Sequence, residues 1–392
     1  MNRSTTPKSA TLTCRVVTTL EEWQRLEPQW DALLDASPEG TPWQSFAFLT
    51  GWWKHLSERM PLRLFVVERE GIVCLVMPLQ ISTWRMMPGL PVRMLEPVSM
   101  VMDVNRPRMA LGPVDRAAYH CALDAIWQHA REWHLIRLDE KAWDDAEVAI
   151  LRDYALERGC IFRQHFSHLI PFLDLRQGWN SFLQQRSQRM RKNLKAARRK
   201  LEQLGPLRLQ GYETRAEIGE AFRIIIELHA RSRKRKLKIE HSTSTGYQEF
   251  FRTWGDAMAA RGQCRAFALF CGDNPVAATI AFTAGDVYYS TQIVHDEQYA
   301  ACSPGTLLES MEIEHLMGER RHATYDFLGS FLNNKLRWTD SAAHTTYIFV
   351  MQRSFRNFIM DGYYTWLKPF VRPIIVAMYR KITGKQAARN SR

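Results

Sequence analysis

Apolar residues recur along the first half of the chain at the two spacings that distinguish helices from strands. Three or four positions separate a set of large apolar residues, namely Trp23, Leu26, Trp30 and Leu34. This spacing predicts a helix over 20–34. The apolar segments 62–67 and 72–81 flank a turn that contains Gly71, which predicts a β-hairpin. The same reading predicts strands over 11–17 and 135–138, helices over 41–56, 115–132 and 144–158, an extended segment over 161–175, and a long loop with a short strand over 84–113.

The second half repeats this order of elements. A helix is expected over 179–204, because Leu183, Met190, Leu194, Ala197, Leu201 and Leu204 form one apolar stripe. Further strands are expected over 207–211, 264–271, 276–283, 287–294, 323–328 and 345–351, and helices over 217–229, 246–261 and 306–318. Strands that are partly antiparallel and alternate with helices predict an α/β (α+β) fold, a mixed sheet flanked by helices. We place a first domain at 1–170, a second at 171–352 and a tail at 353–392.

Charge is concentrated in three stretches of this chain, whose 392 residues carry a formal charge of +12. Basic residues gather in 186–200, 231–238 and 353–392. An anionic partner is therefore expected: nucleic acid, an anionic membrane or a phosphorylated cofactor. No helix-turn-helix, zinc-finger or RNP pattern accompanies the runs, which disfavours nucleic acid. For 186–200 the alternatives are a solvated helix face and a lining for phosphates.

The seven cysteines form no Cys-x-x-Cys pair, which favours reduced thiols and a cytoplasmic protein. No apolar run reaches the roughly 20 residues of a membrane span. In the tail, aromatic and basic residues interleave around Pro369 and Pro373. Two interpretations stay open for 355–382, contact with a membrane interface and docking on the fold.

Two sites in the second half carry candidate chemistry. Ser303-Pro304-Gly305-Thr306 begins a helix: Ser303 suits the N-cap, and Gly305 lets a ligand approach backbone N–H groups that can bind phosphate. The alternative is an ordinary capped helix. Asp326 lies at the end of a strand, where α/β active sites gather, or it faces solvent. The spacing Glu312-x-x-His315 suits a metal but occurs once, so no metal is expected.

These segments occur in an order that resembles the CelD/BcsL branch of the GNAT acyltransferases, relatives of the FemABX aminoacyl transferases. The resemblance is carried by 273–278, 303–308 and 325–329 with Lys335 and Trp338, and in the first half by 41–45, 51–53, 77–79 and the basic helix around 189–193. The chain departs from the family where acidic and Tyr-Lys residues precede the terminal Trp. Ser330, Phe331 and Asn334 stand there, and Lys335 alone matches.

The resemblance implies two GNAT-like folds in tandem, with acyl-CoA as co-substrate of the second. The sheet should open between strands 287–294 and 323–328, where the pantetheine arm would lie. The pyrophosphate would bind the start of the helix that follows, at Ser303, Gly305 and Thr306. A backbone N–H near Ile293 or Val294 would stabilise the oxyanion.

Direct attack by an amine on the thioester needs a base but no nucleophilic cysteine. Asp326 and His295 are the candidates for the base, against the alternative that both hold loops. Lys335 would meet a phosphate or carboxylate of the acceptor, or it is a surface lysine.

The sequence therefore predicts an acyl-CoA-dependent N-acyltransferase, cytoplasmic, with the inner face of the membrane as a second location. The expected acceptor is an amino sugar of exopolysaccharide or cell-envelope biosynthesis. A sphingoid long-chain base, as in a bacterial ceramide synthase, is the alternative. A catalytically inactive basic binding module is the alternative of another class.

Overall fold

The computed structural model describes residues 11–37, 40–57, 60–87, 90–98, 108–232, 245–329, 335–363 and 365. Its strands are β1 (Leu12–Val17), β2 (Leu62–Arg69), β3 (Ile72–Met87), β4 (Leu90–Pro97), β5 (Leu135–Lys141), β6 (Ile161–Asp174), β7 (Leu207–Tyr212), β8 (Cys264–Cys271), β9 (Asn274–Ala284), β10 (Val287–His295), β11 (Thr324–Asp326) and β12 (Ala342–Met351). Its helices are α1 (Leu20–Gln24), α2 (Glu27–Asp35), α3 (Phe46–Trp52), α4 (Arg116–Gln128), α5 (Ala146–Glu157), α6 (Trp179–Gln185), α7 (Gln188–Glu202), α8 (Arg215–Arg231), α10 (Thr245–Ala260), α11 (Pro304–Glu319) and α12 (Phe355–Gly362), with short turns η1 (Pro42–Gln44), η2 (Trp53–Ser57) and η4 (Glu297–Cys302).

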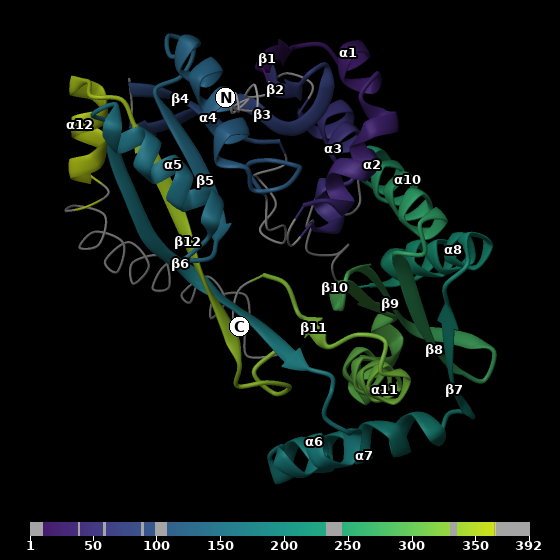
Figure 1. Cartoon of the computed structure of the whole chain (residues 1–392). Coiled ribbons are helices and arrows are strands. Elements are labelled where there is room, and N and C mark those ends of the chain that lie inside the picture. Colours follow the sequence, from purple (N-terminus) through teal and green to yellow (C-terminus); the bar gives the residue numbers. More distant parts are fainter. Residues whose placement is uncertain are drawn as a thin grey trace, which may run out of the picture.

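Within the described residues the strands form one twelve-stranded sheet, in the order β1-β2-β3-β4-β5-β12-β6-β11-β10-β9-β8-β7. Neighbouring strands are antiparallel except in two pairs, β4 with β5 and β10 with β11. Helices flank the sheet (Figure 1). The expected fold class, a mixed and partly antiparallel sheet with helices, is confirmed.

Strand β6 joins the two halves of this sheet. It pairs with β12 from Ile161 to Pro171 and with β11 from Phe172 to Asp174. Figure 1 shows β6 as a long strand that runs from one half to the other. Strand β12, from the end of the second half, inserts between β5 and β6. The expected division at residue 170 falls within β6, and the domain boundaries stay a prediction.

Three elements differ from the expectation. The helix over 20–34 is two helices, because Pro28 lies in the first turn of α2 and lacks the N–H that a continuous helix needs. The helix over 179–204 is also divided, since the Ser187 side chain caps α7. The long loop over 84–113 is wrong in part, because β3 continues to Met87 and pairs with β4. The apolar stripe of α7 is confirmed, with Met190, Leu194, Ala197 and Leu201 buried.

The core is continuous across the two halves of the chain. Trp43 of η1 lies 5.0 Å, between ring centroids, from Tyr289 of β10. It also lies 6.1 Å from Trp254 of α10. Aromatic packing of this kind fixes the first half on one face of β8–β10. The same packing determines where a cavity between the halves can form.

The tail begins as a helix docked on the first half. The side-chain amide of Asn357 donates to the carbonyl oxygens of His134 and Gln352, and Asp361 pairs with Arg163 at 2.6 Å. Phe355 and Phe358 stay 82% and 71% exposed. Most of the expected interface segment 355–382, namely residues 364 and 366–382, lies outside the described residues, as does the rest of the tail. In the part of the chain that is described, no helix is both long enough and apolar enough to cross a membrane.

Candidate active site

The sheet opens between β10 and β11 in the second half. Parallel pairing ends at Tyr289 and Asp326, where β11 also ends. Strand β10 continues through residues 290–295, paired there with β9. A register shift between Ser290 and Gln292 interrupts that pairing, and a bulge of this kind bends a strand. The gap lies between the two strands that the family resemblance implied.

The N-terminus of α11 lies beside the far end of this gap. A Cβ built on Gly305 would be 3.5 Å from Nδ1 of His295 and 3.5 Å from Cγ2 of Ile293. Ser303 occupies the N-cap position with a φ of 54°, but its side chain makes no cap hydrogen bond. The first amide groups of α11 are therefore not capped by a serine hydroxyl, and such groups bind anions.

Two basic side chains adjoin the same helix start. Arg337 donates from Nη1 to Oγ1 of Thr306 at 3.0 Å. Lys200, at the end of the basic face of α7, donates to the carbonyl oxygen of Ala301 at 3.3 Å. Positive side chains at a helix N-terminus strengthen its attraction for phosphate. Ser303, Gly305 and Thr306 thus lie together with two cations that could contact an anionic ligand.

Asp326 and Lys335 meet at the vertex of the gap. The buried Asp326 carboxylate accepts a hydrogen bond from the N–H of Leu328 at 2.9 Å. The Lys335 ammonium donates to the carbonyl oxygen of the same Leu328. Burial lowers the pKa of Lys335, although the charges of Asp326 and Glu309 oppose this. Both side chains hold the turn in which Leu328 and Gly329 have positive φ angles.

His295 lies at the other end of the gap from Asp326. Asp326 is level with Tyr289, and His295 is six residues further along β10. At about 3.3 Å per residue, this separates them by roughly 20 Å along the strand. One reacting atom cannot touch both side chains, so the two candidate bases are alternatives. The roles assigned to these residues stay predictions.

Two carboxyl groups on α11 are buried and have partners that the sequence did not indicate. Glu312 accepts hydrogen bonds from the hydroxyls of Tyr288 at 2.5 Å and Tyr325 at 3.3 Å. Glu309 accepts one from the indole of Trp338 at 2.6 Å. Burial raises the pKa of Glu312 to about 8 and that of Glu309 to about 7. Glu312 thus joins α11 to the paired ends of β10 and β11, and Glu309 joins it to Trp338.

The spacing of Glu312 and His315 does not reflect a metal site in the described residues. Glu312 binds the two tyrosines, whereas His315 contacts Glu319 at 2.9 Å. No group of three or more His, Cys, Asp or Glu side chains in the described part of the chain is placed to hold a metal ion.

Gln292 and His229 form a second pair that the sequence did not indicate. The side-chain amide of Gln292, just beyond the bulge in β10, donates to Nε2 of His229 at 2.5 Å. His229 lies on α8 and is 7% exposed. The basic run 231–238 follows His229 closely, and the sequence analysis interpreted this region by its charge without assigning a role to the histidine.

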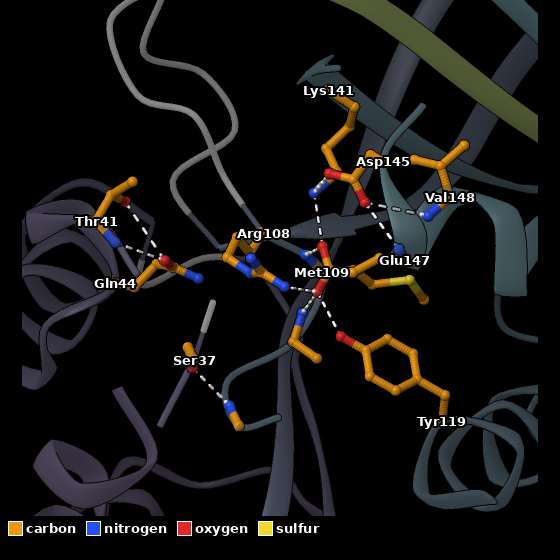
Figure 2. Close-up of polar contacts among 12 residues, drawn as sticks. Ser37, Thr41, Gln44, Arg108, Met109, Tyr119, Lys141, Asp145, Glu147 and Val148 are labelled. Atoms are coloured by element: carbon orange, nitrogen blue, oxygen red, sulfur yellow. Dashed lines mark hydrogen bonds and ion pairs between the residues drawn. The ribbon is translucent and has the colours of Figure 1, made fainter. Parts of the chain in front are cut away.

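A cavity of about 730 Å³ lies between the two halves of the molecule. Its lining includes Ser37, Thr41, Arg108, Glu140, Lys141 and Asp145 of the first half, Gln263, Asp286, Val287 and Tyr289 of the second, and Ala343, His344 and Thr345 of β12. Figure 2 shows part of this wall, where Arg108 and Lys141 both point toward Glu147. No local sequence pattern predicted the cavity, since its walls come from segments far apart in the chain.

Comparison with known proteins relates this geometry to a family. Residues 188–335 match the family model described as an acetyltransferase (GNAT) domain. No curated protein sequence matches the chain.

Solved structures share the fold at low sequence identity. FemX has 12% identity and a TM-score of 0.52, covering 85% of this chain and 96% of FemX. A conserved protein of unknown function from Bacteroides thetaiotaomicron has 11% identity and a TM-score of 0.53, covering 84% and 97%. A tandem GNAT protein from the clavulanic acid biosynthesis pathway has 14% identity and a TM-score of 0.43, covering 87% and 99%. Residues 188–335 are therefore similar to a GNAT acetyltransferase domain, and the fold is like that of FemX.

Proposed function

We propose that this protein is an acyl-CoA-dependent N-acyltransferase. The observation that carries the proposal is the gap between β10 and β11, with the N-terminus of α11 at its open end. An extended pantetheine arm fits a gap between strands, because its amide groups can hydrogen-bond to the backbone of β10 beyond the residue at which β11 ends. The pyrophosphate would then meet Gly305 and Thr306, where the helix amides and Arg337 favour negative charge.

The reaction requires that the acceptor nitrogen attack the carbonyl carbon of the thioester. The C–N bond forms, the C–S bond breaks, the nitrogen loses a proton to a base, and the CoA thiolate takes up a proton. A backbone N–H of β10 at the bulge between Ser290 and Gln292, next to the vertex, would stabilise the oxyanion, whereas Ile293 and Val294 would line the part of the arm nearer the phosphates. No acyl-enzyme is formed on this route.

We assign the base to Asp326, since it lies at the vertex, where the arm would end. His295 lies beside Gly305, so its position suits contact with the phosphates better than proton transfer. Lys335, held at the same turn as Asp326, would contact an anionic group of the acceptor or keep the turn in place.

For the acceptor we propose an amino sugar of exopolysaccharide or cell-envelope biosynthesis, with a sphingoid long-chain base as the alternative. Both acceptors are found at a bilayer. The exposed Phe355 and Phe358 favour a protein that works in the cytoplasm against the inner face of the membrane. The basic aromatic segment 355–382 would make that contact.

The test uses the full chain, acetyl-CoA and palmitoyl-CoA, with glucosamine or sphinganine as acceptor, and measures release of the CoA thiol. Acetyl transfer to glucosamine would support the first acceptor, and a preference for palmitoyl-CoA with sphinganine would favour the second. Calorimetric titration with CoA checks the donor site separately. Failure to bind CoA, together with salt-sensitive binding of nucleic acid, would indicate the basic binding module instead.

Asp326→Asn tests the base. We expect kcat to fall by about 100-fold or more, the usual contribution of a general base, while the affinity for CoA stays the same. Because Asp326 also holds the turn at Leu328, the unfolding temperature must be measured alongside. Unchanged kcat in a folded variant would exclude Asp326 as the base.

A further inference from the structure

We propose that the cavity between the halves is the acceptor site and that it selects a protonated, polar amine through the carboxylate of Glu140. The inference rests on the proposed function, because it names the class of acceptor for the same reaction. It is carried by where the cavity lies, by the charges that line it, and by the position of Glu140.

The cavity reaches the vertex of the donor gap. Tyr289 belongs to the last pair between β10 and β11, and it also lines the cavity. Val287, two residues earlier on β10, lines it as well. A nitrogen held in the cavity therefore approaches the point where the pantetheine arm would present its thioester. This juxtaposition is what an acyl transfer between two bound substrates requires.

The lining is acidic, although the whole chain carries a charge of +12. Of the described residues that line the cavity, Asp35, Glu140, Asp145 and Asp286 are carboxylates, and two, Arg108 and Lys141, are cations. The formal charge of this wall is therefore −2. A basic protein with an acidic cavity attracts a cation to that cavity.

Both cations of the wall are already held by carboxylates. Glu147 lies behind them, 2.6 Å from Nζ of Lys141 and 3.2 Å from Arg108. Lys141 also pairs with Asp145 at 3.0 Å. The hydroxyl of Tyr119 donates to Glu147 at 2.5 Å, which completes a buried cluster (Figure 2). These bonds neutralise Arg108 and Lys141, so an anionic acceptor would find little positive charge there.

Glu140 is the carboxylate best placed to meet an ammonium group. It is 9% exposed and lines the cavity, and the Nε2 atom of His168 lies 3.5 Å from its Oε1 atom. It lies where the pairing of β5 with β12 changes register between Thr346 and Ile348. A buried carboxylate loses its water shell, which an ammonium ligand at hydrogen-bond distance would offset.

The same chemistry limits the rest of the acceptor. An alkyl chain would exclude water from the charged groups of this wall, and a phosphate would meet the carboxylate of Glu140, so both are disfavoured. The structure thus assigns to the cavity an amine with a polar body, such as an amino sugar without a nearby phosphate.

The experiment is calorimetry on the full chain with three primary amines, glucosamine, 1,5-diaminopentane and sphinganine, each compared with its N-acetylated form. We expect a polar amine to bind at least tenfold more tightly than its N-acetylated form. Glu140→Gln should remove at least tenfold of that preference and leave the affinity for CoA unchanged. Equal affinities within every pair, or a preference that survives Glu140→Gln, would overturn the proposal, as would a preference for sphinganine alone.

Two further variants keep the test decisive. Glu68→Gln, a matched change on β2 outside the cavity, should leave the preference intact. If Glu140→Gln does not fold, Asp286→Asn on the opposite wall should still reduce the preference about threefold, and no reduction would count against the proposal. A protein that prefers the amine but does not bind CoA would refute the proposed function, and the cavity would then be an amine site without a part in acyl transfer. The converse would refute the inference alone.

Discussion

Each half of the sheet contains one parallel strand–helix–strand unit, and the two units differ at the helix. In the first half β4 and β5 pair at Met94 and Leu95, with α4 between them in the chain. In the second half β10 and β11 pair over three residues, with α11 between them. Because the topology is shared, the side chains at each helix start decide what each unit can bind.

The start of α4 is occupied by its own carboxylate. Asp115 accepts hydrogen bonds from the N–H groups of Ala117 at 2.9 Å and Ala118 at 3.4 Å. In α11 the corresponding place has Ser303, whose side chain makes no such bond, followed by Gly305. A carboxylate at a helix N-terminus repels phosphate, whereas uncapped amides attract it. Only the second unit therefore suits a CoA donor.

The buried glutamates of the two halves also differ. Glu147 is surrounded by cations, so although burial alone would raise its pKa, the charges of Lys141 and Arg108 lower it to about 2. Glu312 contacts two tyrosines, and burial raises its pKa to about 8. The first half thus uses a charged cluster to shape the cavity wall, and the second keeps a neutral carboxyl under the donor gap.

The largest expected effect comes from breaking the charged cluster. Glu147→Gln leaves Lys141 and Arg108 buried without their shared carboxylate, which should lower the free energy of unfolding by about 3–5 kcal/mol. Urea unfolding at pH 7 measures this, with the exposed Glu157→Gln on α5 as the control. Equal loss in both variants would mean that the cluster is not important for stability.

The second prediction introduces at the start of α11 a carboxylate like the one that Asp115 provides at the start of α4. Gly305→Asp places a carboxylate at the helix start, where a Cβ meets only ordinary contacts at 3.5 Å. We expect CoA affinity to fall about 100-fold, or about 2.7 kcal/mol, with little change in unfolding temperature. Gly219→Asp, at the fifth residue of α8 with open space around it, is the matched control. Calorimetric titration with CoA that shows equal binding in both variants would remove the phosphate site from α11.

The parts that were predictable from sequence are those that local pattern determines. The hairpin of β2 and β3, the strands β8–β10 and the start of α11 follow from apolar periodicity and from turn residues such as Gly71 and Gly305. The gap between β10 and β11 was expected only from the family resemblance, because no spacing of residues in the sequence indicates it. Glu140 and His229 were not found, because each depends on a partner 28 or 63 residues away, and Glu147 was not found because Tyr119 and Arg108, unlike the nearby Lys141, are distant in sequence.

The third prediction contrasts the two halves by pH. The folded-state pKa of Glu312, about 8, lies above the ordinary 4.5, so the folded protein binds more protons than the unfolded chain between those values. Its contribution to stability is therefore lost as the pH rises from about 4.5 toward 8, and Glu312→Gln should flatten that decline. Glu147, with a pKa of about 2, contributes above about pH 4.5 and loses its effect as the pH falls toward 2. Urea unfolding from pH 3 to 9 measures the decline in stability at both the acidic and the alkaline end. If the alkaline decline is the same in Glu312→Gln, the raised pKa of Glu312 is contradicted.

The smallest expected effect concerns α12, the first helix of the tail, which packs on the first half of the molecule. Replacing Phe355 and Phe358 by serine removes two exposed rings whose insertion into a bilayer interface would bury apolar surface. We expect binding to anionic phosphatidylglycerol vesicles to weaken threefold to tenfold in a sedimentation assay. Ile72→Ser, at a residue 73% exposed on β3, is the control for a general loss of surface hydrophobicity. If that control weakens binding as much as the α12 variant, contact with the membrane through α12 is refuted. The membrane would then not distinguish the first half of the molecule from the second.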